Sequence, residues 1–244
     1  MHKDSHTTSP ATNRIEEMVR DVPGWSPLDQ LQVLFGLVFA TGGIAGDVIE
    51  VGSWCGRSAS ALGLAAKLTG NTLVHCIDLF PAREDWRRTP EGDAWFETII
   101  DGQHLGGYQT QLVWKEPFER DIVPLYAERE GILEIFKETI ARNGLTDVIR
   151  PFRGNGAMFA RAAAPDLRCR VAFIDGDHGY DEVCADIATI ERFLVPGGWI
   201  CFDDAFSSYE GVNRAIEDRI IKNPNYELGQ QMTRKCFIAR RKAG

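Results

Sequence analysis

The fold is constrained most by the stretch between residues 48 and 58, which reads Val-Ile-Glu-Val-Gly-Ser-Trp-Cys-Gly-Arg-Ser. It begins as a short apolar strand, passes through a turn with two glycines, and ends in an Ala- and Leu-rich helix. Glycine lets the backbone approach a bound molecule closely, and the first N–H groups of a helix face such a molecule. In an open α/β sheet, a turn of this kind lies at the carboxyl end of a strand, where ligands bind. The stretch therefore predicts an α/β fold with a ligand cradle.

The glycine spacing of the cradle narrows the choice of ligand. Glu-Val-Gly-x-x-x-Gly does not match the G-x-G-x-x-G pattern of dinucleotide-binding proteins, and the chain contains no P-loop. Glu50 precedes the first glycine by two residues, which suits a cationic or neutral polar ligand better than a pyrophosphate. The second predicted strand, 72–78, ends in Asp78, where an acid can accept two ribose hydroxyls. The alternative is that Glu50 is a half-buried strand acid and Asp78 a helix cap.

A second pattern places acids after two later strands. The segment Phe173-Ile174-Asp175-Gly176-Asp177-His178-Gly179-Tyr180 follows the fourth predicted strand, and Asp203 and Asp204 follow the fifth. Because the carboxyl ends of parallel strands meet at one edge, Asp175, Asp203 and Asp204 are expected to converge beside the cradle. Three carboxylates in a cleft repel one another unless a cation neutralises them, and Mg²⁺ prefers oxygen ligands. The alternative is a pair of solvated turn acids at 203 and 204 without a metal.

At these residues the chain resembles the class I S-adenosylmethionine-dependent methyltransferases. The acid pattern resembles their metal-dependent O-methyltransferases that act on small molecules, including catechols and sugars of antibiotics. The resemblance implies a Rossmann-like, doubly wound, mostly parallel seven-stranded sheet with strand order 3-2-1-4-5-7-6. It implies S-adenosylmethionine as the cofactor and the following cofactor-binding residues: Glu50, Gly52, Ser53, Gly56, Ser58, Asp78, Gly154, Asn155 and Asp175.

The same resemblance assigns roles to the acid pattern. Asp175, Asp203 and Asp204 would ligate Mg²⁺, and either Asp177 or His178 would be the general base. His178 stands where the catechol enzymes have a lysine, and Asp177 stands where some sugar methyltransferases have their base. A metal-bound hydroxyl loses its proton more easily, and a base with a pKa near neutrality then removes that proton. The choice between Asp177 and His178 stays open at this point.

The rest of the chain fits one methyltransferase domain over residues 14–244, after a disordered tail at 1–13. Residues 14–43 are expected to form a helical cap, with one helix starting at Ser26 and Pro27. The segment 80–125 mixes aromatic and charged residues and interrupts the strand–helix rhythm, which suggests a lid over the acceptor substrate. A satellite core or an oligomer contact explains its aromatic residues equally well. Further helices are expected at 57–68, 127–143, 180–193 and 208–222, the last with a Ser207–Glu210 capping box. The remaining strands are expected at 47–51, 148–153, 169–175 and 199–202, and at an antiparallel pair, 226–228 and 235–239.

Composition excludes several kinds of partner. A formal net charge of −8 argues against nucleic-acid binding. The longest apolar run is too short to span a membrane, and residues 1–20 are polar, unlike a signal peptide. Six cysteines without C-x-x-C spacing suggest a reducing, cytoplasmic location. The apolar face of the N-terminal helices would allow a homo-oligomer.

The resemblance thus implies an enzyme that transfers a methyl group to a hydroxyl of a small molecule such as a sugar, polyol or phenol. Mg²⁺ would assist the transfer, and natural-product biosynthesis would be one setting for it. Three alternatives are kept. One is a metal-independent methyltransferase of the same fold. Another is a nicotinamide-dependent oxidoreductase, which Asp78 and the cradle allow but the glycine spacing and the acids do not favour. The third is a non-catalytic binding or scaffold protein of the same fold, against which the acids at 50, 78, 175 and 203 argue.

Overall fold

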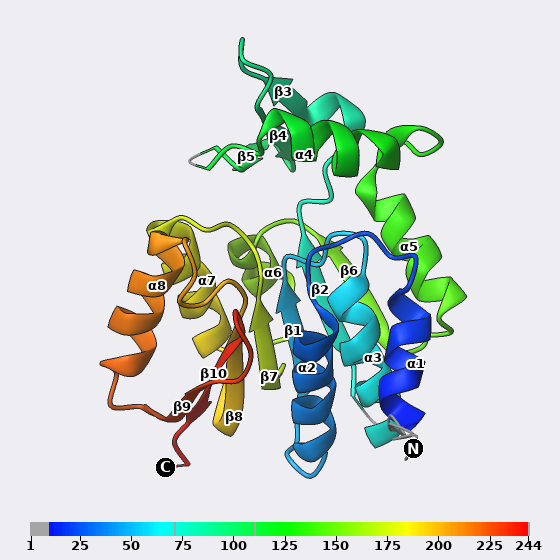
Figure 1. Cartoon of the computed structure of the whole chain (residues 1–244). Helices are drawn as coiled ribbons and strands as arrows, with labels where there is room; N and C mark the ends of the chain where they lie inside the picture. The colour runs from blue at the N-terminus through cyan, green and yellow to red at the C-terminus, as the bar shows by residue number, and fades with distance from the viewer. Residues whose placement is uncertain (1–9, 71, 110, 244) are drawn as a thin grey trace, which may run out of the picture.

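The main body of the protein is a seven-stranded sheet between two layers of helices (Figure 1). The computed structural model describes residues 10–70, 72–109 and 111–243. In spatial order the strands are β6 (Ile149–Arg153), β2 (Val74–Asp78), β1 (Asp47–Val51), β7 (Cys169–Ile174), β8 (Leu194–Phe202), β10 (Phe237–Arg241) and β9 (Tyr226–Gln231). The first five strands run parallel, and β10 is antiparallel to both β8 and β9. Numbered as sheet strands along the chain, this order is 3-2-1-4-5-7-6, as predicted.

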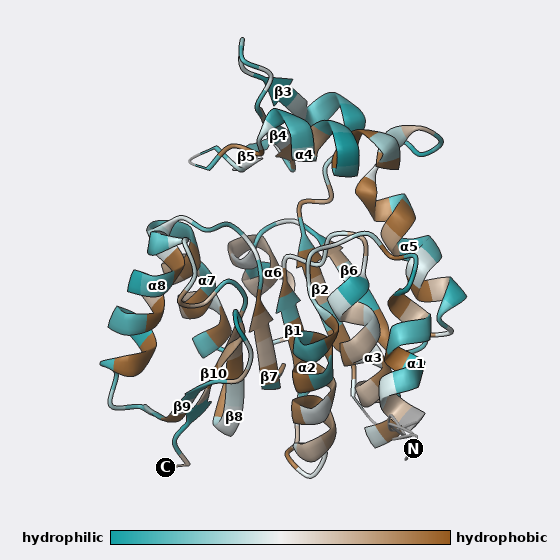
Figure 2. Ribbon diagram, in the orientation of Figure 1, coloured by the Kyte–Doolittle hydropathy of each residue, from teal (hydrophilic) through white to brown (hydrophobic). Residues whose placement is uncertain are grey.

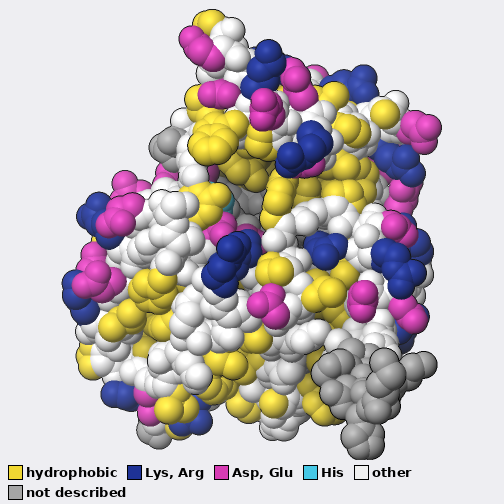
Figure 3. Space-filling model, viewed as in Figure 1, with side chains coloured by type: hydrophobic (Ala, Val, Ile, Leu, Met, Phe, Trp, Pro, Cys, Tyr) yellow, Lys and Arg dark blue, Asp and Glu magenta, His cyan; other side chains and the backbone are white. Residues whose placement is uncertain are grey.

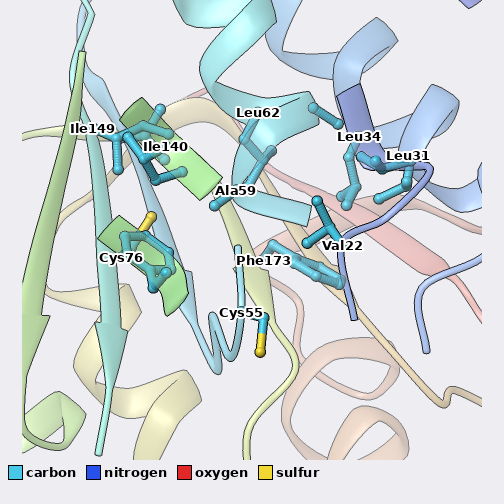
Figure 4. Packing of buried hydrophobic residues seen from close by; sticks show 14 of the residues in the cluster. Val22, Leu31, Leu34, Cys55, Ala59, Leu62, Cys76, Ile140, Ile149 and Phe173 are labelled. Carbon is cyan, nitrogen blue, oxygen red and sulfur yellow. The ribbon is translucent and has the colours of Figure 1, made fainter. Parts of the chain in front are cut away.

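Alternate residues of each strand enter one of two cores, because successive side chains point to opposite faces of a sheet. Val48 and Val171 pack into the core under α1 (Pro10–Val19), α2 (Leu28–Ala40), α3 (Arg57–Thr69) and α5 (Ile132–Arg142). Ile49 and Ala172 pack into the core under α6 (Gly156–Ala162), α7 (Tyr180–Glu191) and α8 (Glu210–Ile216). Figure 2 shows the sheet as largely hydrophobic, as expected for parallel strands covered on both faces. In Figure 4, Ala59 and Leu62 of α3 lie between side chains of α2 and those of α5 and β6.

The N-terminal helices differ from the prediction at their boundaries. Helix α1 begins at Pro10, so it includes the last four residues of the expected tail, while residues 1–9 lie outside the described part of the chain. This start gives α1 three turns, which bury Ile15, Met18 and Val19. Helix α2 begins at Leu28, after Pro27 in an extended conformation, and buries Leu31, Leu34 and Val38 as expected.

The start of β8 and the entry to α8 also differ from the prediction. The strand was expected to begin at residue 199, but Leu194 already pairs with Cys169, and the register then shifts before Trp199 pairs with Val171. The predicted Ser207–Glu210 capping box does not form. Ser207 Oγ instead donates to the Asp204 carbonyl, at 2.6 Å, and accepts the Tyr209 N–H at 3.3 Å. Helix α8 therefore begins at Glu210 and continues as a π-helical turn, η4 (Glu217–Ile221).

The insertion after β2 forms a small layer above the carboxyl edge of the sheet (Figure 1). It contains a separate antiparallel sheet, β3 (Trp86–Arg88), β4 (Ala94–Ile100) and β5 (Gln103–Gly107). Short helical segments surround this sheet: η1 (Arg83–Asp85), α4 (Lys115–Pro117), η2 (Phe118–Ile122) and η3 (Val123–Tyr126). The rings of Trp86, Phe96 and Phe118 pack together. The ring centroid of Trp86 lies 5.2 Å from that of Phe96 and 4.8 Å from that of Phe118. Phe118, with Trp86 packed against it, belongs to the same core as Val48 and Val171, so this aromatic cluster of the insertion is continuous with the core under α1, α2, α3 and α5.

Within the described residues, every helix is too short or too polar to cross a membrane.

Candidate active site

A cavity of about 1590 Å³ lies between the carboxyl edge of the main sheet and the insertion. Figure 3 shows the hollow on one face of the molecule, beneath the insertion and bordered by hydrophobic side chains. Its walls come from the cradle, the tips of β2, β6, β7 and β8, the loop before α2, the insertion and the β9–β10 turn. The predicted site residues that line it are Gly52, Ser53, Ser58, Asp78, Gly154, Asn155, Asp175, Asp177, His178, Asp203 and Asp204. Glu50 and Gly56 lie outside this lining.

Gly52 fixes the shape of the cradle. Its φ angle is +86°, and a Cβ at this position would lie 1.9 Å from the carbonyl oxygen of Asp175. The carboxyl ends of β1 and β7 therefore meet with room only for hydrogen at residue 52. Gly56 also has a positive φ, +89°, at the N-cap of α3, where a Cβ would contact the Phe136 ring at 3.2 Å. It shapes the turn from behind the cavity wall.

Asp78 binds the cradle turn with both carboxylate oxygens. Oδ2 accepts the N–H groups of Ser53, at 2.9 Å, and Trp54, at 2.8 Å. Oδ1 accepts the N–H of Phe80 at 2.6 Å. Burial raises the pKa of Asp78, and these three backbone donors oppose the rise. Because each carboxylate oxygen has about two acceptor positions, Oδ1 keeps capacity for one further donor from the cavity.

Glu50 lies beneath the turn and is fully buried. Burial raises its pKa to about 7, while the hydroxyls of Ser53 and Ser58 and the thiol of Cys76 lower it. Among the described residues, neither carboxylate oxygen has a partner at full hydrogen-bond geometry. A buried acid with unpaired oxygens next to Ser53 and Ser58, which do line the cavity, is suited to a cationic ligand group.

The far end of the cradle is formed by the loop after β6. Asn155 caps α6, because its Oδ1 accepts the Met158 N–H at 2.9 Å. Asp186 of α7 lies against this loop, with carboxylate oxygens 3.1 Å and 3.2 Å from where Cβ atoms on Gly156 and Gly176 would lie. Burial, and then the neighbouring Asp177, raise the pKa of Asp186 to about 7. This end of the cavity therefore holds an acid that the sequence did not single out.

The acids after β7 and β8 converge as predicted, together with a lysine. The Asp175 and Asp203 carboxyls lie side by side, and burial followed by repulsion from Asp203 raises the pKa of Asp175 well above its usual range. The Lys235 ammonium lies 2.8 Å from Asp203 Oδ2 and 3.3 Å from Asp204 Oδ1. Burial would lower the pKa of Lys235, but Asp203, Asp204 and Asp175 raise it. The neutralising cation in this structure is thus a side chain.

The predicted magnesium site does not match this arrangement. Mg²⁺ binds oxygen ligands at about 2.0–2.1 Å in octahedral geometry. Here Asp203 Oδ2 and Asp204 Oδ1 are both bound to the Lys235 ammonium. A divalent ion on the same oxygens would lie against that positive charge. Across the described ranges, no three His, Cys, Asp or Glu side chains are arranged to hold a metal ion.

The two candidate bases have different surroundings. Asp177 Oδ1 accepts the Gly179 N–H at 2.9 Å, so it shapes the loop before α7. His178 Nε2 lies 3.2 Å from Asp204 Oδ2, and its ring stacks on Tyr209 with centroids 4.0 Å apart. Burial tends to raise the pKa of Asp204, but His178 and Lys235 lower it overall. Asp204 is therefore an ionised carboxylate that orients the imidazole.

Three lining residues were missed from the sequence: Asp186, Lys235 and Tyr209. Tyr108 and Trp114 also line the cavity, and they lie in the segment 80–125 that was expected to form a lid. Burial and the carboxylates of Asp175 and Asp78 raise the pKa of the Tyr108 hydroxyl. None of these residues belongs to a motif with fixed spacing, because each enters the site through tertiary packing.

The comparisons with known proteins agree with this fold. A family profile described as "Methyltransferase domain" matches residues 49–205, more than half of the chain. Among similar solved structures, the O-methyltransferase NovP has 14% identity and a TM-score of 0.61 over 95% of this chain and 96% of its own. An O-methyltransferase from Bacillus cereus in complex with SAH has 16% identity and a TM-score of 0.59, covering 98% and 94%.

A third similar structure is the O-methyltransferase TomG from Streptomyces achromogenes, described as involved in tomaymycin synthesis and in complex with SAM. It has 13% identity and a TM-score of 0.56, over 97% of this chain and 91% of its own. At these identities the structures demonstrate a common fold, while the profile match establishes the family. The chain belongs to the methyltransferase-domain family.

Proposed function

We propose that this protein transfers the methyl group of S-adenosylmethionine to a hydroxyl of a small molecule. The observation that carries the proposal is the Gly52 cradle, which lies between the acids Asp78 and Asp175 and opens into the cavity. The cofactor carries a sulfonium and an ammonium, both cationic, and this acidic wall is complementary to them. Two of the similar structures hold SAM or SAH, which supports the same donor. Methyl transfer is therefore favoured over the nicotinamide alternative.

Each part of the cradle has a role in holding the donor. The open position on Asp78 Oδ1 would accept a ribose hydroxyl, and Gly154 and Asn155 would border the adenine. Glu50 would act from below, through Ser53 and Ser58, toward the methionine ammonium. When bound, the cofactor supplies an electrophilic methyl group on a positively charged sulfur. What remains for the protein is to align the acceptor oxygen with that methyl group, exclude water and remove one proton.

His178 is the base that the geometry favours. With its Nε2–H donated to Asp204, His178 can take the proton of an acceptor hydroxyl on Nδ1. Asp177 Oδ1 accepts the Gly179 N–H, which ties that carboxylate to the loop before α7. We expect His178→Ala to lower kcat by about 10²–10⁴-fold with little change in SAH affinity. His104→Ala, on the exposed face of β5, is the matched control. An unchanged kcat in His178→Ala would instead indicate that Asp177 is the general base.

The acceptor side of the cavity suits a molecule with a flat face. Trp25, Trp54, Phe96, Tyr108 and Trp114 contribute aromatic surface to the lining. Phenols and the apolar faces of sugar or polyol rings both pack on such surfaces. The insertion would then be the lid over the acceptor, and its ring contacts Trp86–Phe96 and Phe96–Tyr108 hold two of these rings, Phe96 and Tyr108, in place.

Two measurements test the proposal. Calorimetric titration with SAH should give one saturable site, and NAD should give none. A panel of phenols, sugars and polyols is then incubated with donor labelled in the methyl group, with Mg²⁺ or with chelator. The expected result is transfer to oxygen in at least one acceptor class. Absence of SAH binding would refute the proposal, and transfer to nitrogen or carbon alone would refute the O-methyl assignment.

A further inference from the structure

We propose that the Lys235 ammonium is the resident cation of this site and takes the place of the divalent metal that three convergent carboxylates would otherwise bind. The structural part of this proposal stands on the geometry of Lys235 alone, and its catalytic consequence rests on the proposed function. It predicts that methyl transfer by this chain is independent of metal.

The backbone around Lys235 fixes the lysine at this position. Lys235 lies in the turn between β9 and β10, and its carbonyl accepts the Ala205 N–H at 2.9 Å, next to Asp204. Within the same turn, Thr233 Oγ1 accepts the Cys236 N–H at 3.1 Å, and the Met232 N–H donates to the Cys236 carbonyl at 2.8 Å. The hairpin is thus joined to the segment that carries two of the acids. The side chain is only 15% exposed, so its ammonium is confined beside them.

The Lys235 ammonium is held between two of the three carboxylates. Asp203 is almost fully buried, and its Oδ2 binds Lys235 at 2.8 Å. Lys235 also binds Asp204 Oδ1, at 3.3 Å. Asp204 Oδ2 lies 3.2 Å from His178 Nε2, so the carboxylate that contacts the ammonium also orients the base. The positive charge that a divalent metal would supply at these oxygens is therefore already present.

The same ammonium has a role in the transfer step. Lys235 and His178 both line the cavity, so an acceptor hydroxyl can be held between them. The hydroxyl proton passes to His178, and the oxygen lone pair bonds to the methyl carbon. The carbon–sulfur bond breaks with its electron pair on sulfur, which becomes a neutral thioether. Lys235 keeps all its protons and stabilises the negative charge that develops on the oxygen, as a fixed positive charge does in a water-excluded site.

Manganese binding tests the proposal without an acceptor. Mn²⁺ is titrated into the full chain and followed by electron paramagnetic resonance for wild type, Lys235→Met and the charge-preserving control Lys235→Arg. Wild type and Lys235→Arg should show no saturable site. Lys235→Met should bind one Mn²⁺, with an affinity at least about tenfold above any residual binding by wild type. The reason is that the ammonium no longer repels the metal ion. Mg²⁺ should raise the Tm of Lys235→Met and leave that of wild type unchanged.

The outcomes separate this proposal from the proposed function. One saturable Mn²⁺ on wild type that Asp203→Asn abolishes would overturn it, as would methyl transfer that stops in chelator and returns with Mg²⁺. If Lys235→Met fails to fold, the wild-type titration still decides between a metal site and an internal cation. SAH binding is measured on the same samples. Its loss would refute the methyltransferase function and leave the manganese result valid.

Discussion

Both the fold and the ligand cradle require glycine at position 52. A side chain there needs a left-handed backbone at φ +86° and would overlap the Asp175 carbonyl. We therefore expect Gly52→Ala to lower the free energy of unfolding by about 2–4 kcal/mol and to abolish SAH binding. Urea unfolding and calorimetry measure the two effects. Gly36→Ala is the control, because a Cβ on this α2 glycine meets nothing within 4 Å in the described structure. Unchanged SAH affinity in Gly52→Ala would contradict the cradle assignment.

Glu50 makes the stability of the protein depend on pH. Its pKa is about 7 when folded, against 4.5 for an ordinary glutamate. Between these values the unfolded chain has released this proton while the folded chain keeps it. The contribution of protonated Glu50 to the free energy of unfolding is therefore complete below pH 4.5 and is lost as the pH rises to about 7. Glutamine at position 50 does not titrate, so Glu50→Gln avoids this loss. Between pH 4.5 and pH 8 the free energy of unfolding of Glu50→Gln, relative to that of wild type, should increase by up to about 3 kcal/mol.

Urea unfolding at both pH values checks the Glu50 prediction. Glu16→Gln, on the exposed side of α1, serves as the matched variant. Asp186, whose burial also raises its pKa to about 7, contributes equally to wild type and variant, so the difference isolates Glu50. If Glu50→Gln and Glu16→Gln changed in parallel with pH, Glu50 would have to be ionised in the folded protein.

At the scale of elements, regular periodicity predicted the sheet and failed at the insertion. Strands β1, β2, β6 and β7 were found within two residues, and β1, β2 and β7 are largely apolar runs covered on both faces. The acids at or after the ends of β2, β7 and β8 were found because strand direction determines where they meet. The strands β3, β4 and β5 were not predicted, because their aromatic residues serve both the aromatic cluster of the insertion and the cavity wall. Lys235 was missed because a hairpin brings it to β8 from over 30 residues away in the sequence.

The insertion yields a prediction about acceptor binding. Trp114 lies at the N-cap of α4, is 74% exposed and lines the cavity. Because it contributes little to packing, Trp114→Ala should leave stability and SAH affinity nearly unchanged. It should lower kcat/KM for an acceptor found in the screen by about tenfold or more, the effect of removing one aromatic contact. Ile99→Ala is the control, since Ile99 on β4 is 59% exposed and outside the cavity lining. A loss of SAH affinity instead would make the insertion a cofactor-binding element.

In the molecule as a whole, the carboxyl edge of the sheet carries the candidate site, and the amino edge carries contacts that stabilise the fold. The carboxyl edge carries the unpaired Glu50 oxygens, the crowded acids and the positive-φ cradle, which all oppose stability. At the amino edge, Arg170 is 2% exposed at the start of β7 and connects four segments. Nη1 donates to the Gly46 carbonyl, at 2.7 Å, and to Thr72 Oγ1, at 2.6 Å. Nη2 donates to Thr69 Oγ1 at 3.2 Å and to the Val38 carbonyl at 3.4 Å.

Arg170→Met tests whether the two edges are independent. The substitution keeps an apolar stem but removes the donor to the buried Thr72 hydroxyl and to the partly buried Gly46 carbonyl. We therefore expect the free energy of unfolding to fall by about 2–4 kcal/mol. Because these contacts lie at the opposite end of β7 from Asp175, SAH affinity below the melting temperature should stay within about twofold, a change under 0.5 kcal/mol. Arg168→Met, an exposed arginine two residues earlier, controls for charge. If SAH affinity fell in proportion to stability, the Arg170 contacts at one end of β7 would affect ligand binding at its other end. The cradle would then depend on packing across the whole sheet.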